Sequence, residues 1–322
     1  MVIVVHISTF LISAAVIWFF AGLLIGAVDR IAKRFHKNDF TVAFFVLGFL
    51  TSISEISVAV NSGLNNVPQV SVGNLVGASF VLLLFVVPII AIAGNGVELK
   101  NTLSRRNLLY ALGLVLLPAL LIIDGDATRQ DGLIILAAYI TLLYLIRVEK
   151  GPLKDAREVK DELLDKKRTA WDAAKIIVGA ALIFLAGHFL VEETVFFANL
   201  LSVPSSLIGL ILLSIGTNIP EIAIGFKAIL KKHKDVALGD YLGSAVTNVP
   251  IFGILAITNG PFRMEASEFV VATILMVAGL ATFYIFAGSK KQISRREGTI
   301  LLVFYAVFLA VQFANLARFA VD

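Results

Sequence analysis

The chain contains no cysteine, which excludes disulfides, thiolate metal centres and a cysteine nucleophile. Charged residues are also scarce: they make up 16% of the 322 residues, whereas 58% are hydrophobic. With a mean hydropathy of +0.92, this composition excludes an ordinary soluble globule and indicates a polytopic α-helical membrane protein. The sequence also lacks a phosphate-binding glycine loop, which argues against a pump driven by ATP.

The first residues of the sequence do not show the pattern expected of a cleavable leader. Residues Val2 to Val5 are apolar, no basic region precedes them, and no small-residue cleavage site follows. We therefore expect the first membrane helix here and no signal peptide. The net charge of +4 is explained by basic residues in loops, so we predict no nucleic-acid partner; the bilayer and the transported cations are the expected partners.

Ten apolar segments are long enough to span a bilayer. They cover residues 3–27, 40–64, 70–94, 106–124, 131–148, 172–197, 205–230, 236–259, 267–287 and 298–318. Lys and Arg fall almost entirely in alternate loops between these segments, and eight of them lie between Arg147 and Arg168. By the positive-inside rule, these loops lie in the cytoplasm and both termini lie outside, in a protein of the cell membrane.

The chain is also duplicated at a constant offset of 166 residues, over a stretch of about 90 residues. The offset relates Thr51 to Thr217, Ile53 to Ile219, Glu55 to Glu221, Ile56 to Ile222, Gly73 to Gly239, Gly77 to Gly243, Gly132 to Gly298, Tyr139 to Tyr305 and Leu143 to Leu309. Because each half holds an odd number of spans, the second half must enter the membrane in the opposite sense.

We therefore predict an all-α polytopic membrane protein with ten transmembrane helices in two inverted five-helix repeats. The first repeat covers residues 1–148 and the second covers residues 171–322. Residues 149–170 form a charged cytoplasmic linker.

The second repeat carries a helix-breaking run inside an apolar segment, from Ser214 to Glu221. Pro220 has no N–H, so the carbonyl of Gly216 loses its helical partner. Leu50 holds the matching position in the first repeat. An interrupted membrane helix of this kind offers free carbonyls beside a buried acid, which favours a cation site over a simple proline kink.

Three acids fall deep within the predicted spans: Glu55, Glu221 and Asp240. Inverted repeats bring the two glutamates together near the midplane of the membrane. Two facing carboxylates cannot both stay ionised without a cation, and hard oxygen ligands suit Ca²⁺ or a similar ion. The polar side chains expected to complete the coordination shell are Thr51, Ser52, Thr217 and Asn218.

A polar ladder follows on the next helix of the second repeat. Asp240, Ser244 and Asn248 are spaced i, i+4 and i+8, so they share one helix face. This face points either to the cation site or to neighbouring helices that satisfy it. The matching residues of the first repeat are less polar, so the predicted site is weighted to the second repeat; they are Asn74, Ala78 and Leu82.

Two motifs resemble those of the calcium/cation antiporter superfamily, which includes the sodium/calcium exchangers. Residues 216–221 are similar to its G-T-S-x-P-E signature, and residues 239–244 are similar to its G-N-x-x-G-S element. Residues 51–55 and 73–78 look like the partner copies. The resemblance implies that Glu55 and Glu221 bind Ca²⁺ as the metal ligands. It gives supporting roles to Thr51, Ser52, Thr217, Asn218 and Ser244.

The sequence departs from the family pattern at five positions. Ala78 and Asn218 replace serines, Leu82 replaces a polar residue, Ser54 replaces a proline and Asp240 replaces an asparagine. Fewer oxygen ligands in the first repeat put a full set of Na⁺ sites in question. The additional carboxylate of Asp240 is able to carry a proton instead.

The leading hypothesis is thus a secondary antiporter that exchanges Ca²⁺, or a related divalent cation, for Na⁺ or H⁺, without a cofactor and without enzyme activity. The resemblance implies that alternating access arises from movement of the first and sixth helices against the rest. A cation channel is one alternative. An intramembrane aspartyl protease is another, suggested by Gly239-Asp240, but the Tyr-Asp pair that such enzymes need is absent from the sequence.

Overall fold

The long apolar runs of the sequence form helices in a computed structural model that describes residues 2–32, 44, 48–98, 103–150, 166–219, 221–222, 225, 234–264, 266–289 and 292–319. The helices are α1 (Val2–Ala32), α3 (Gly48–Thr51), α4 (Ile53–Leu64), α5 (Pro68–Phe80), η3 (Val81–Val86), α6 (Val87–Ala93), α7 (Arg105–Leu121), η4 (Ile122–Asp124), α8 (Arg129–Lys150), α10 (Lys166–Leu200), α11 (Ser205–Ile208), η5 (Gly209–Leu213), α12 (Ser214–Thr217), α14 (Lys234–Asn259), α15 (Ala266–Ser289) and α16 (Arg295–Phe319). Four two-residue strands join them: β1 (Val97–Glu98), β2 (Asp126–Ala127), β3 (Phe262–Arg263) and β4 (Gln292–Ile293).

Eight helical stretches within the described ranges are long and apolar enough to cross a membrane. They coincide with eight of the ten segments predicted from the sequence. In the other two segments, 40–64 and 205–230, the described residues form short, interrupted helices, and the remainder lies outside the described part of the chain. The count of ten therefore stays a prediction. Of the predicted linker, residues 149–150 belong to α8 and 166–170 to α10, while 151–165 lie outside the described residues.

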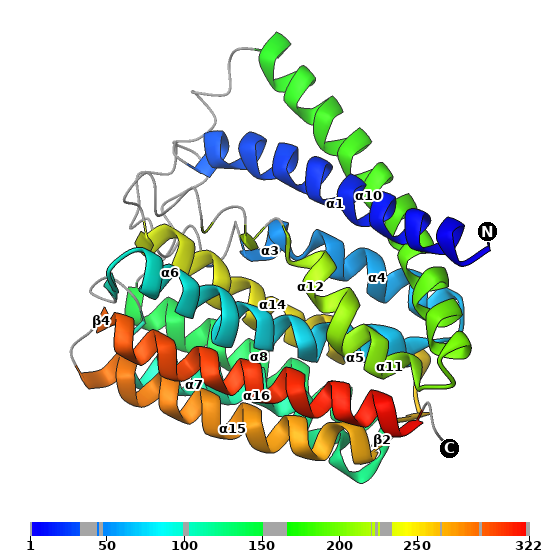
Figure 1. Cartoon of the computed structure of the whole chain (residues 1–322). Coiled ribbons are helices and arrows are strands. Elements are labelled where there is room, and N and C mark those ends of the chain that lie inside the picture. The colour runs from blue at the N-terminus through cyan, green and yellow to red at the C-terminus, as the bar shows by residue number, and fades with distance from the viewer. Residues whose placement is uncertain are drawn as a thin grey trace.

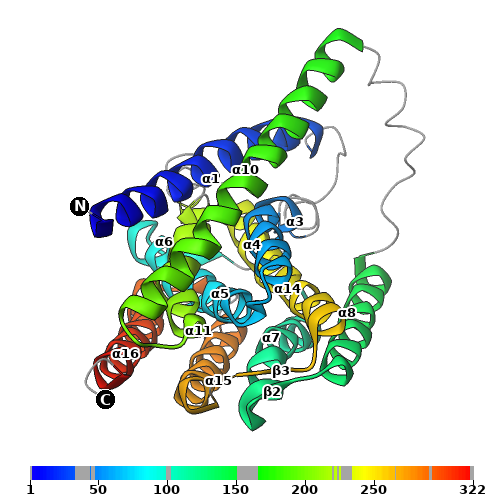
Figure 2. The same ribbon diagram turned by 90° about the vertical axis from the view of Figure 1, so that its right-hand side faces the viewer.

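Helices α1 and α10 lie side by side as a layer over one face of the remaining bundle (Figures 1 and 2). A small apolar cluster of its own packs beneath this layer, including Ile17 of α1, Leu190 of α10 and Val58 of α4. Two polar side chains of α4 add contacts to α10: Ser57 Oγ donates to the Ile183 carbonyl at 3.1 Å, and Asn61 Nδ2 donates to the Phe184 carbonyl at 3.1 Å. Among the described residues, the layer thus meets the bundle mainly where α10 packs against α4.

The centre of the bundle is formed by the continuous stretch α5–η3–α6 and by α14. Their spans are 83% and 78% buried, whereas the spans of α1, α8 and α16 are 17–22% buried. These peripheral helices expose large apolar side chains such as Leu11, Ile140 and Val303. Apolar exposure of this extent suits contact with lipid, so the protein is an integral membrane protein with its most enclosed helices at the core.

Two close helix crossings repeat at the 166-residue offset. A Cβ atom on Gly77 of α5 would clash with the Leu210 carbonyl, and a Cβ atom on Gly243 of α14 would clash with the Phe44 carbonyl. Leu210 lies in the π-helical stretch η5, and Phe44 also has π-helical conformation. At both crossings the backbones of two segments are in direct contact, which leaves room only for glycine.

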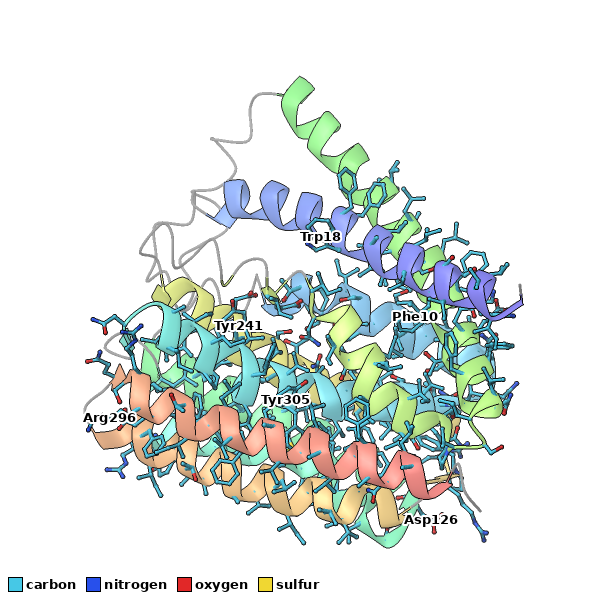
Figure 3. The ribbon with its side chains drawn as sticks, in the orientation of Figure 1. Phe10, Trp18, Asp126, Tyr241, Arg296 and Tyr305 are labelled. Carbon is cyan, nitrogen blue, oxygen red and sulfur yellow. The ribbon has the colours of Figure 1, made fainter. Side chains whose placement is uncertain are left out.

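Short contacts at the two ends of the bundle follow the same offset. Strand β1 pairs with β4 and β2 pairs with β3, both antiparallel. Asp126 of β2 and Arg296, which follows β4, lie at opposite ends of the bundle (Figure 3). Helices α8 and α16 begin with equivalent capping boxes, in which Asp131 accepts from the Thr128 N–H at 2.8 Å and Glu297 accepts from the Ser294 N–H at 2.7 Å.

The glycine crossing makes a testable prediction. Gly77→Val should destabilise the folded protein by about 1–3 kcal/mol or more, because the added carbons overlap a backbone carbonyl that cannot move aside. Gly113→Ala is the matched control, since an added Cβ meets no atom within 4 Å there. Thermal unfolding in detergent measures both variants. Equal melting temperatures for Gly77→Val and Gly113→Ala would contradict the close crossing.

Candidate functional site

The candidate site lies where the two interrupted segments meet. In the first, α3 ends at Thr51 and α4 resumes at Ile53; in the second, α12 ends at Thr217. The residues at the breaks, Ser52 and Asn218, are 166 positions apart and have similar dihedral angles, φ −73° and ψ 5° against φ −92° and ψ 8°. Both lie near the bridge region that ends a helix. The same local break thus occurs once in each half.

In the first half, the break forms without a proline. Pro220 lies outside the described residues, and the first half has Ser54 in its place. The carbonyl of Gly216, expected to be free, accepts the backbone N–H of Asn218. Leu50 lies in α3, directly before Thr51, and its carbonyl remains a candidate ligand.

The acids and their polar neighbours are fully enclosed. Glu55, Glu221 and Asp240 all have 0% exposure. The same holds for Thr51, Ser52, Ser54, Thr217, Asn218, Asn74 and Ser244. Burying so many polar groups is unfavourable unless each finds a partner, which makes their contacts informative.

Beside each break, one threonine hydroxyl donates a hydrogen bond to the central helix of the opposite half. Thr51 Oγ1 donates to Asp240 Oδ1 of α14 at 3.2 Å. Thr217 Oγ1 donates to Asn74 Oδ1 of α5 at 3.1 Å. The two pairs correspond at the 166-residue offset, but the acceptor is a carboxylate in one and an amide in the other. A third contact, Ser52 Oγ to Ser244 Oγ at 3.1 Å, joins the first break to α14.

The two glutamates have different surroundings. Glu55 accepts from Ser54 Oγ at 2.8 Å and from Asn218 Nδ2 at 3.5 Å. Neither carboxylate oxygen of Glu221 has a hydrogen-bond partner among the described residues. Its backbone carbonyl accepts from the Tyr241 hydroxyl at 2.9 Å. The Thr51 side chain lies close enough to act on the charge of Glu221, but no described donor meets hydrogen-bond geometry with that carboxylate, so its side chain is the less firmly held of the two.

The three carboxyl groups are close enough to act on one another electrostatically. Two buried oxygens of the site, Asp240 Oδ2 and Asn218 Oδ1, have no hydrogen-bond partner within the described part of the chain. The same is true of Asn74 Nδ2 and, two turns further along α14, of both amide atoms of Asn248. Negative charge and unsatisfied oxygens in one buried region form an environment that favours a cation. Across the described ranges, no three Asp, Glu, His or Cys side chains are grouped closely enough to hold a metal ion by themselves, so hydroxyl, amide and carbonyl oxygens would have to contribute.

The structure thus brings together most residues singled out from the sequence, and adds three others. Asn248 is 2% exposed on the same helix as Asp240 and Ser244, and its side chain makes no hydrogen bond to the described residues. The additional residues are Ser54, Asn74 and Tyr241. The offset alone indicates Asn74, as the counterpart of Asp240. Ser54 is noticeable only as a hydroxyl in the position of Pro220, and no sequence pattern indicates Tyr241.

Each comparison with known proteins matches most of the length of this chain. The sequence model of the family described as "Sodium/calcium exchanger protein" matches residues 5–148 and 171–314. The sodium/calcium exchanger MaX1 of Methanosarcina acetivorans is 22% identical, over 89% of this chain and 92% of its own. The putative antiporter CaxA of Alkalimonas amylolytica is 26% identical, over 91% and 96%. A solved structure of the sodium–calcium exchanger NCX_Mj has a similar fold, with a TM-score of 0.69, 22% identity and coverage of 96% and 99%.

The two threonine bonds can be tested by isosteric substitution. Thr51→Val and Thr217→Val should both lower the melting temperature, because each leaves a buried acceptor without its donor at a cost of about 1–3 kcal/mol. Thr51→Val should be the more harmful, since its acceptor is a carboxylate.

Thr194→Val is the control: that hydroxyl is equally buried, but it donates to the Leu190 carbonyl of its own helix. Thermal unfolding of the three variants measures the order. A larger effect from Thr217→Val than from Thr51→Val would contradict the assignment of the charged pair.

Proposed function

Because the chain belongs to the sodium/calcium exchanger protein family, we propose that it is a secondary active antiporter that exchanges Ca²⁺, or a related divalent cation, for Na⁺ or H⁺. The observation that carries the proposal is the group of three fully buried carboxyl groups, Glu55, Glu221 and Asp240, inside a membrane protein. Buried acids in a membrane interior mark ion pathways. A cation compensates their charge, and exchanging one cation for another retains that compensation throughout the cycle.

Glu55 and Glu221 are the proposed principal ligands of the divalent ion, one from each break. The proposed supporting ligands are Asp240, Thr51, Ser52, Thr217, Asn218, Ser244, Asn248 and the carbonyls of Leu50 and Gly216. The burial of the polar side chains in this set supports it, as do the hydrogen bonds from Thr51 to Asp240 and between Ser52 and Ser244. The gathering of hard oxygen atoms favours Ca²⁺ and chemically similar ions.

The proposed architecture has ten membrane helices in two inverted repeats, residues 1–148 and 171–322, with 149–170 as a cytoplasmic linker. The 166-residue offset between the paired glycine crossings, the helix breaks and the capping boxes supports it. The two segments matched by the family model begin at the same offset. The distribution of Lys and Arg supports cytoplasmic loops on the linker side and both termini outside the cell membrane.

Alternating access is proposed to arise from movement of the α1 and α10 layer over the bundle. The separate apolar cluster beneath these helices supports a boundary at that place. The breaks lie beside this boundary, because Ile17 of α1 and Leu213 of η5 pack in the same cluster. Sliding the layer would then open the site to one side of the membrane or the other.

Proton coupling is the second candidate for the counter-ion, and Asp240 favours it. This carboxyl group adds a third buried charge and stands where the family pattern has an asparagine. One oxygen is bonded to Thr51, and the other has no partner among the described side chains. Protonation of Asp240 would cancel its charge without a Na⁺ ion. A channel and a protease are disfavoured, since the relatives are exchangers and antiporters.

The function can be tested by neutralising one ligand. Glu221→Gln should abolish Ca²⁺ uptake into proteoliposomes while the protein still folds and inserts, because the ion loses one of its two symmetric carboxylates. Glu192→Gln should keep full activity, since this side chain is 54% exposed on α10. Normal exchange by Glu221→Gln would remove this residue from the mechanism.

The counter-ion is tested by the driving gradient. Uptake of radioactive Ca²⁺ is compared under an outward Na⁺ gradient and under an imposed pH gradient, both at clamped voltage. We expect one of the two to drive uptake that saturates with Ca²⁺. If the pH gradient drives Ca²⁺ uptake, Asp240→Asn should abolish the pH dependence of that uptake. If neither gradient drives uptake, Ca²⁺ is not the substrate.

A further inference from the structure

The two glutamates are held through different atoms. The carboxylate of Glu55 accepts from Ser54 Oγ at 2.8 Å, whereas both carboxylate oxygens of Glu221 lack a hydrogen-bond partner in the described ranges. At Glu221 it is the backbone that is held, because its carbonyl accepts from the Tyr241 hydroxyl at 2.9 Å. One acid therefore has a fixed side chain, and the other has a fixed main chain.

The duplication shows that neither bond has an equivalent in the other half. Ser54 corresponds at the 166-residue offset to Pro220, and Tyr241 corresponds to Leu75. Proline and leucine side chains have no hydrogen-bond donor. Chemistry alone therefore prevents the symmetric arrangement, and the difference between the glutamates is built into the sequence.

Ser54 has a choice of acceptors. Its Oγ lies 3.1 Å from the Thr51 carbonyl and 3.4 Å from the Thr217 carbonyl, besides the carboxylate of Glu55. A hydroxyl has one proton to donate, and the short bond to a carboxylate is the strongest of the three. An ionised carboxylate has about four acceptor sites, so Ser54 can keep donating to Glu55 while a cation takes another lone pair of the same group.

We propose that Ser54 and Tyr241 are positioning residues of the cation site: Ser54 orients the carboxylate of Glu55 before the ion arrives, and Tyr241 fixes the backbone at Glu221 while the ion itself orders that carboxylate. The inference rests on the proposed antiport function. Orienting a ligand in advance lowers the cost of binding, so both residues act on the affinity for the cation.

The first variants remove one hydroxyl each. Ser54→Ala should raise the KM for Ca²⁺ about tenfold to a hundredfold with little change in the maximal rate, as expected for the loss of one hydrogen bond to a charged group. Ser54→Thr keeps a hydroxyl and should restore most of the affinity. Tyr241→Phe should raise the KM about fivefold, because the Glu221 backbone loses its donor.

The controls remove similar hydroxyls elsewhere. The first control is Ser62→Ala. Ser62 lies on the same helix as Ser54, and its hydroxyl is equally buried and donates to the Ala59 carbonyl. The second control is Tyr305→Phe. Tyr305 lies on α16 and is 3% exposed, and Figure 3 shows Tyr305 and Tyr241 at separate places in the bundle. Both controls should keep the KM of the unsubstituted protein. Initial rates of Ca²⁺ uptake into proteoliposomes are measured for all variants, and thermal unfolding confirms that each is folded.

The outcomes separate this inference from the function on which it rests. No saturable uptake of Ca²⁺ by the unsubstituted protein would overturn both. Saturable uptake with an unchanged KM in folded Ser54→Ala and Tyr241→Phe would overturn the inference alone. A KM for Ser54→Thr as high as for Ser54→Ala would show that packing, and not the hydroxyl, matters. A raised KM in the two site variants, restored by threonine and absent from the controls, supports it.

Discussion

Three carboxyl groups buried inside a membrane protein, two of them beside helix breaks and one on the long helix α14, are the constraint on which the rest of the structure depends. An acid in such a place is unfavourable unless donors or cations compensate it. The helix breaks at Ser52 and Asn218 turn hydroxyls and amides toward these acids, and the neighbouring central helices supply Asn74, Asp240 and Ser244. The donors still do not satisfy every oxygen. This remaining deficit supports the proposed cation site.

The close packing of the helices is what places these groups within reach of one another. Backbone carbonyls of the interrupted segments lie directly against Gly77 and Gly243 of the central helices. A larger residue at either position would separate a break from the helix that carries its partners, and the bonds from Thr217 to Asn74 and from Thr51 to Asp240 would be lost. The same small residues therefore serve both packing and the geometry of the site.

The duplication gives the two halves one plan, but it does not make them chemically equal. Each half supplies a break, a glutamate and a threonine that bonds to the opposite central helix. The first half has a serine before its glutamate and an asparagine on its central helix, whereas the second has a proline and an aspartate at these positions. Such differences give unequal surroundings to the two glutamates that we propose as ligands of one ion.

Much of the fold could be predicted from the sequence, because a run of about 20 apolar residues has few alternatives to a membrane helix. Eight predicted spans coincide with long helices. The two segments that carry the glutamates are different, since hydroxyl, glycine and amide residues interrupt them and local patterns do not show where a helix stops. The structure places the stop at Ser52 and Asn218 and gives the Gly216 carbonyl a partner that was not foreseen.

The sequence by itself determined the apolar spans, the 166-residue duplication and the positions of three acids inside those spans. Acids are unfavourable there and therefore indicate a functional site. These are properties of composition and spacing, which are legible without coordinates. Only the tertiary structure decided which acid is held and by what. The donors of Thr51, Ser54 and Tyr241 reach acceptors on other turns or other helices, and those distances depend on how the breaks and helices pack in three dimensions. Hydrogen bonds between distant parts of a chain leave no periodic signal in it, so the unequal treatment of Glu55 and Glu221 became visible only in the folded protein.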